Sequence, residues 1–76
     1  MTIKELADKL QQMYTNAPKG EKVAMIHLFG IVYATEIQKC GFSKKEIAES
    51  AKISNKYGTE INKGVKLSKY VLVKNQ

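Results

Sequence analysis

One helix-length stretch, Val23 to Ile37, is too apolar to lie on the surface of a small protein. Eleven of its fifteen residues are apolar or aromatic, which exceeds a single helical stripe and predicts burial on most sides. His27, Thr35 and Glu36 interrupt the stretch, so it falls short of the about 20 apolar residues that span a bilayer. It predicts a central core helix, either buried entirely within this chain or partly reserved for a dimer interface.

The length and composition of the chain favour one globular domain. A chain of 76 residues lies near the lower size limit for folding without disulfides or metals, and its 43% hydrophobic residues suit a packed core. Cys40 is the one cysteine and cannot form an internal disulfide, and no secretory signal pattern opens the sequence. We therefore expect a single cytoplasmic domain over residues 1–76, with no membrane association.

Positive charge is concentrated in the second half of the chain. Met1 to Lys39 carries five lysines and four acids, for a net charge of +1, whereas Cys40 to Gln76 carries eight lysines and three acids, for +5. A basic half of this kind is typical of a surface that meets a polyanion.

Two capping boxes mark the starts of helices. Thr2 with Glu5, and Ser43 with Glu46, have the spacing in which a hydroxyl and a carboxylate each accept a backbone N–H of the first turn. The first box predicts a helix from Ile3 with apolar residues every three or four positions. The predicted inward positions are Ile3, Leu6, Ala7, Leu10, Met13 and Tyr14.

Proline and glycine divide the remaining helices. Pro18 ends the first helix and predicts that the second begins between Pro18 and Glu21. Gly30 is the candidate point at which the apolar helix bends or divides. Gly41 suits the left-handed position that follows a helix end, so we expect the apolar helix to end at Cys40.

The segment that begins at Ser43 predicts two short helices that cross steeply. Ala48 supplies the small side chain that such a crossing needs, Ile53 would fill the space between the helices, and Ser54 would cap the second one. We expect the second helix to run from about Asn55 to Ser68. Its predicted inward positions are Tyr57, Ile61, Val65 and Leu67.

This spacing, over Ser43 to Ile61, resembles the helix-turn-helix (HTH) of bacterial DNA-binding proteins. More closely, M-I-H-L-F-G-I at residues 25–31 and Y-G-T-E-I-N-K-G at residues 57–64 resemble a family of small bacterial HTH-like domain proteins. That resemblance covers nearly the whole chain, places the HTH unit at about residues 43–68, and implies the fold rather than an activity.

Two residues depart from the usual HTH pattern. Lys52 stands where a glycine with left-handed backbone is usual, and a lysine adopts that conformation only at a steric cost. Gly58 stands where the second helix usually carries a buried valine or a similar residue. The two helices would then approach more closely or be shifted in register.

The HTH resemblance implies which residues would meet DNA. Asn55 or Asn62 would pair with adenine, Thr59 would touch a thymine methyl group, and lysines would contact phosphate or guanine. Lys44 and Lys45, at the start of the first helix, would lie beside the DNA backbone. The predicted DNA-binding residues are Lys44, Lys45, Ser54, Asn55, Lys56, Thr59, Asn62, Lys63 and Lys66. The ordinary alternative is a capping serine and solvated lysines.

The C-terminal segment Tyr70 to Val73 is aromatic and β-branched and predicts a short strand. The predicted fold is therefore an all-α HTH bundle of about four helices with a short C-terminal β-strand, like a truncated winged helix. The strand would pair near Phe42, pair with a second copy, or remain unpaired. An unpaired edge, together with the apolar stretch, leads to the hypothesis of a homodimer.

Duplex DNA is the predicted partner, and the predicted role is that of a transcriptional regulator or DNA-associated accessory protein. The alternative is a protein–protein interaction module on an HTH-like scaffold without DNA binding. The chain holds one Asp, one His and one Cys, and lacks a phosphate loop, so we expect no enzyme activity, cofactor, metal site or small-molecule ligand. We expect His27 to be a packed side chain and Cys40 to be a buried thiol.

Overall fold

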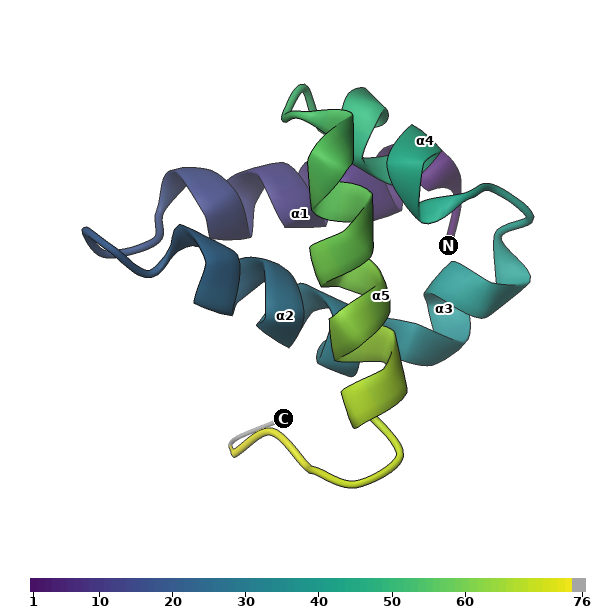
Figure 1. Ribbon diagram of the computed structural model, residues 1–76. Coiled ribbons are helices and arrows are strands. Elements are labelled where there is room, and N and C mark those ends of the chain that lie inside the picture. The colour runs from purple at the N-terminus through teal and green to yellow at the C-terminus, as the bar shows by residue number, and fades with distance from the viewer. Residues whose placement is uncertain (75–76) are drawn as a thin grey trace.

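The computed structural model describes residues 1–74, which form a bundle of helices (Figure 1). These helices are α1 (Ile3–Thr15), α2 (Lys22–Val32), α3 (Ala34–Lys39), α4 (Lys44–Ser50), the 3₁₀ turn η1 (Asn55–Tyr57) and α5 (Gly58–Leu67). The all-α prediction is confirmed for this part of the chain, although with five α-helices rather than about four. The last two positions of the predicted domain, 75 and 76, lie outside the described residues.

The helices surround one apolar core. α1 and α2 run in opposite directions side by side, α5 crosses α2, and α4 lies near the start of α1 (Figure 1). Every α-helix contributes at least one large side chain that is fully buried or nearly so. These side chains are Leu6, Leu10, Ile26, Phe29, Ile37, Ile47 and Ile61.

Both predicted capping boxes are present. The Thr2 hydroxyl accepts the Glu5 N–H at 3.1 Å and the Glu5 carboxylate accepts the Thr2 N–H at 2.8 Å. Ser43 and Glu46 repeat this arrangement at 3.1 and 3.0 Å. These bonds satisfy amide groups that a helix leaves without partners, and α1 accordingly begins at Ile3 as predicted.

The predicted inward face of α1 is also confirmed. Leu6, Ala7 and Leu10 are buried, while Ile3, Met13 and Tyr14 pack half-buried at the edge of the core.

The apolar stretch forms two helices, and the division lies at Tyr33 rather than at Gly30. The backbone of Tyr33 leaves the helical region, with φ −106° and ψ 20°, and the chain turns there between α2 and α3. After this turn, Ala34 and Ile37 on α3 join the core. α2 itself begins at Lys22, one residue after the predicted window.

Gly30 serves the crossing of α2 with α5. A Cβ atom at Gly30 would clash with the carbonyl oxygen of Ile61, and one at Gly64 would clash with the carbonyl oxygen of His27. The two glycines therefore let the backbones of α2 and α5 touch. The predicted burial of the apolar stretch on most sides is only partly met, because Met25, Leu28, Ile31 and Val32 are half-buried and Val23 is exposed.

The predicted C-terminal strand is wrong. No strand occurs within residues 1–74, and Val71 to Val73 form an irregular segment after the turn that follows α5. A single extended segment forms a sheet only against a neighbouring strand, and the residues around Phe42, predicted as one possible partner, form a loop. Tyr70 and Leu72 consequently remain 81% and 95% exposed.

Candidate nucleic-acid interface

The turn between α4 and α5 has the geometry that the HTH pattern predicts. Ala48 is fully buried at the helix crossing, and Ile53 packs partly buried against the core. The N–H of Ile53 donates to the carbonyl of Ala48 at 3.1 Å, and that of Lys52 donates to the carbonyl of Glu49 at 3.0 Å. These two bonds form a Schellman motif, which requires a left-handed residue just after the helix.

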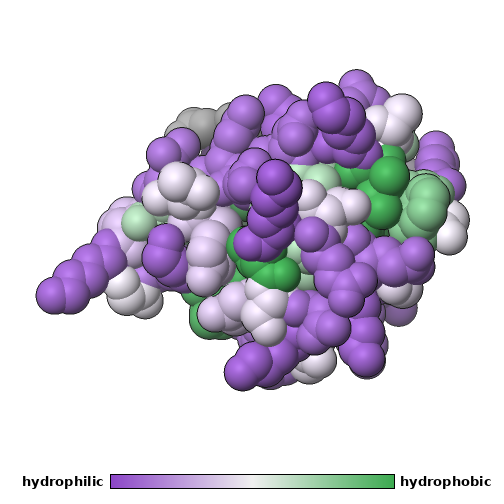
Figure 2. Space-filling view, turned by 90° about the horizontal axis from the view of Figure 1, so that it is seen from above, coloured by the Kyte–Doolittle hydropathy of each residue, from purple (hydrophilic) through white to green (hydrophobic). Residues whose placement is uncertain are grey.

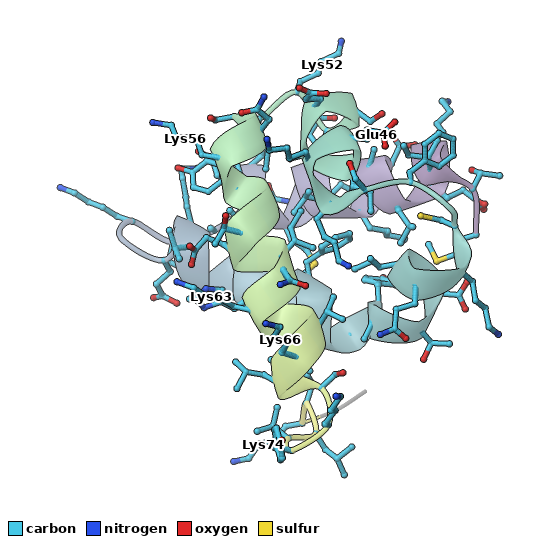
Figure 3. The ribbon with its side chains drawn as sticks, turned by 45° about the vertical axis from the view of Figure 1, so that its right-hand side comes forward. Glu46, Lys52, Lys56, Lys63, Lys66 and Lys74 are labelled. Atoms are coloured by element: carbon cyan, nitrogen blue, oxygen red, sulfur yellow. The ribbon has the colours of Figure 1, made fainter. Side chains whose placement is uncertain are left out.

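Lys52 is that left-handed residue, with φ +64°. The usual glycine is absent, but its backbone conformation is retained. Its side chain is exposed and lies at the tip of the turn (Figure 3).

Gly58, the second departure from the pattern, brings the two helices of the unit close together. A Cβ atom there would lie 3.0 Å from the backbone nitrogen of Lys45 and 3.2 Å from its Cα atom. The first turn of α4 therefore rests on the start of α5. This contact places Lys45, which is exposed, beside the N-terminal end of α5.

The second helix of the unit begins with the single 3₁₀ turn η1 at Asn55 and continues as α5. The Ser54 hydroxyl caps it by accepting the N–H of Lys56 at 3.4 Å. The Asn55 side-chain amide donates to the Glu49 carboxylate at 3.0 Å, so this candidate base-reading group is tied across the turn to α4. Leu67 was predicted to point inward, but its side chain is 42% exposed, so this prediction is wrong.

The outward face of η1 and α5 carries a row of exposed polar side chains. Lys56, Thr59, Lys63 and Lys66 follow one another at spacings of three or four residues, which places them on one side of the helix. Figure 3 shows Lys56, Lys63 and Lys66 in sequence down this side, with Lys52 above them and Lys74 beyond the helix end. We call Lys56, Lys63 and Lys66 the lysine stripe.

Two of the predicted contact residues lie away from the stripe. Asn62 follows the buried Ile61 and is half-buried on the flank of α5. Lys44 is half-buried at the start of α4. Seen from above, the α4 side of the molecule is largely covered by hydrophilic side chains, with small hydrophobic patches between them (Figure 2).

His27 and Glu60 form a contact at this surface that no sequence pattern predicted. The His27 Nε2 atom lies 2.6 Å from Glu60 Oε1, and the Lys63 ammonium lies 3.3 Å from Glu60 Oε2. The hydrogen bond from His27, assisted by Lys63, holds the pKa of the Glu60 carboxyl below its ordinary value. His27 is thus half-buried, as a packed residue would be, but with an acidic partner from α5.

Helical spacing alone would have placed Glu60 next to the stripe, because it lies one turn after Lys56 and one turn before Lys63. No comparable signal connects it with His27, which lies 33 positions earlier in the sequence. Their contact depends on the close crossing of α2 with α5.

The structure also describes the surroundings of Cys40, the grouping of possible metal ligands and the length and apolar character of the helices. Cys40 is half-buried and its thiol donates to the carbonyl of Ile37 at 3.2 Å. Within residues 1–74, no three His, Cys, Asp or Glu side chains are grouped so that they could hold a metal ion. No helix in the same residues has the length and apolar character needed to cross a membrane.

A comparison with protein families bears directly on this fold. The family model described as "HTH-like domain" matches residues 2–74, which is nearly the whole chain. Comparisons with curated proteins and with solved structures gave no match. The match includes the α4–α5 unit and the three α-helices that precede it, and the chain therefore belongs to the HTH-like domain family.

Proposed function

We propose that this protein binds duplex DNA through the outer face of α5 and acts as a transcriptional regulator or DNA-associated accessory protein. The observation that carries the proposal is the lysine stripe on the exposed face of the second helix of an HTH unit. In HTH proteins this helix enters the major groove. The net charge of +5 in the second half of the chain supports the same partner.

In the proposed complex, residues at the start of the helix face the base edges. Asn55 and Thr59 lie there, and an asparagine suits adenine while a threonine methyl suits thymine. Lys45 and Lys52 flank this end, where the DNA backbone would pass. Asn55 would have to leave Glu49 to reach a base, so its contribution to affinity is smaller than that of a free amide.

Fluorescence anisotropy of a labelled random-sequence DNA duplex measures binding and tests the proposal. We expect the logarithm of the affinity to fall with the logarithm of salt concentration by about 0.9 for each phosphate contact. The double variant Lys56→Glu/Lys63→Glu should lose nearly all binding, because two of the three positive charges of the stripe become negative and repel phosphate.

The matched control is Lys19→Glu/Lys39→Glu, which changes the net charge equally at two exposed positions that lie outside η1 and α5. It should keep most of the affinity at moderate salt, because screening weakens charges beyond the contact surface. Equal losses in both double variants would mean that binding follows net charge alone. Absence of binding at low salt would contradict the proposal.

A second candidate is a protein–protein interaction module, for which the C-terminal segment offers a specific observation. Tyr70 and Leu72 are 81% and 95% exposed, and Leu67 and Tyr70 line a shallow apolar groove with Lys63 and Lys66. DNA phosphates do not require exposed aliphatic surface, whereas protein partners bury it. The partner proposed for this surface is a second copy of the chain, which would make the protein a homodimer.

A further inference from the structure

Glu60 is an unfavourable residue on a surface that meets phosphate. It is the one acid after Glu49 in the sequence, and it lies between Lys56 and Lys63 on the helix proposed to contact DNA. A carboxylate at that place repels phosphate and competes for the neighbouring ammonium group. The consequence for binding depends on what neutralises it.

His27 supplies the counterpart from outside the HTH unit. Each oxygen of the Glu60 carboxylate has one partner, with His27 Nε2 at 2.6 Å on α2 and Lys63 Nζ at 3.3 Å on α5. The side chains of His27 and Glu60 are 30% and 22% exposed, whereas that of Lys63 is 59% exposed. The pair is thus held between the two helices while the lysine extends into solvent.

The other charged groups on these elements are cationic. Lys56 lies one turn before Glu60, and the Lys22 ammonium of α2 stands over the Tyr14 ring at 4.5 Å. Within residues 1–74, His27 and Lys63 each pair with the same carboxylate, that of Glu60. The charge state of His27 therefore sets how strongly Glu60 retains Lys63.

We propose that His27 is a positioning residue of the DNA interface, which holds Glu60 against α2 and, when protonated, cancels its charge so that Lys63 is available to phosphate. This inference rests on the proposed function. With a neutral imidazole, Glu60 keeps a full negative charge that competes with phosphate for Lys63. With an imidazolium, the pair is neutral and Lys63 contributes its whole charge to the stripe.

DNA binding should then be linked to proton uptake at His27. By reciprocity, protonation strengthens binding as much as bound DNA favours protonation. The chain has one histidine, and histidine is in general the side chain that gains a proton in mildly acidic solution. Affinity should accordingly be higher at about pH 5.5 than at about pH 8.

The experiment measures anisotropy of one labelled random-sequence duplex at about pH 5.5 and about pH 8, at constant low salt. We expect wild-type protein to bind about five-fold more tightly at the lower pH. His27→Gln retains an amide that can donate to Glu60 but does not titrate, and its affinity should be the same at both pH values. Glu60→Gln should bind more tightly than wild type at the higher pH, because the repelling charge is gone.

Urea unfolding of each variant at both pH values verifies that the compared proteins are folded. Equal wild-type affinity at the two pH values would overturn the inference and leave the proposed function standing. The same pH dependence in His27→Gln would also overturn it, since another group would then be responsible. Absence of binding at either pH would overturn the proposed function and this inference together.

Discussion

Lys52 shows how one residue can retain an HTH turn without the usual glycine. Its left-handed φ of +64° allows the two hydrogen bonds that close α4, and its side chain extends from the tip of the turn. A left-handed backbone costs a residue with a Cβ atom about 1 kcal/mol, which glycine avoids. Retaining lysine there is consistent with the proposed contact between the turn and phosphate.

We predict that Lys52→Gly raises the free energy of unfolding by up to about 1 kcal/mol, because the steric cost disappears while the hydrogen bonds remain. Urea denaturation followed by circular dichroism measures this change. Ser50→Gly is the matched control, since Ser50 is exposed within α4, and it should lower the free energy of unfolding by about 0.5–1 kcal/mol. A destabilised Lys52→Gly protein would contradict the strain argument.

At the scale of the helix, the position of α5 depends on backbone contact with α2. Gly30 and Gly64 face each other at the crossing, and a side chain at either would clash with backbone atoms that cannot rotate away. The same contact brings His27 to Glu60. The orientation of the lysine stripe is therefore coupled to the packing of these two glycines.

We predict that Gly64→Ala lowers the free energy of unfolding by about 3 kcal/mol, because the added methyl group forces α2 and α5 apart. Gly58→Ala is the graded comparison. Its Cβ atom would lie 3.0 Å from the nearest backbone atom, and Gly58 has an ordinary helical φ of −54°, so the loss should be smaller. Equal urea midpoints for wild type and Gly64→Ala would show that the crossing relaxes at no cost.

Over the whole molecule, the C-terminal segment contributes little to the core. Tyr70 and Leu72 are largely exposed, and all the fully buried large side chains precede Val65. The apolar stretch that raised the possibility of a dimer packs mainly against α1 and α5, although Val23 remains 42% exposed. The most exposed large apolar side chains are those of Tyr70 and Leu72, at 81% and 95%.

We predict that Tyr70→Ser/Leu72→Ser changes the free energy of unfolding of the monomer by less than about 0.5 kcal/mol, because neither side chain packs in the core. Sedimentation at high micromolar concentration tests the segment as a dimer interface. A wild-type dimer that becomes a monomer in the double variant would support it. A wild-type protein that sediments as a monomer would contradict the homodimer hypothesis.

The features that the sequence by itself determined depend on residues close together in the chain. Thr2 and Ser43 cap helices through bonds to amides three residues away, and Gly41 takes its positive φ of +81° directly after a helix end. The burial of Ala48 was likewise predictable from the short turn that follows it. Helical spacing was accordingly enough to predict that the residues of the lysine stripe lie on one side of the second helix of the HTH unit.

The tertiary structure decided the features that need a partner distant in the chain. The C-terminal segment has strand-like residues but no neighbouring strand in residues 1–74, so local preference did not become a sheet. The apolar stretch divides at Tyr33, where the turn returns α3 to the core. His27 meets Glu60 because two glycines allow two helices to touch, and the spacing of residues within either helix carries no information about that contact.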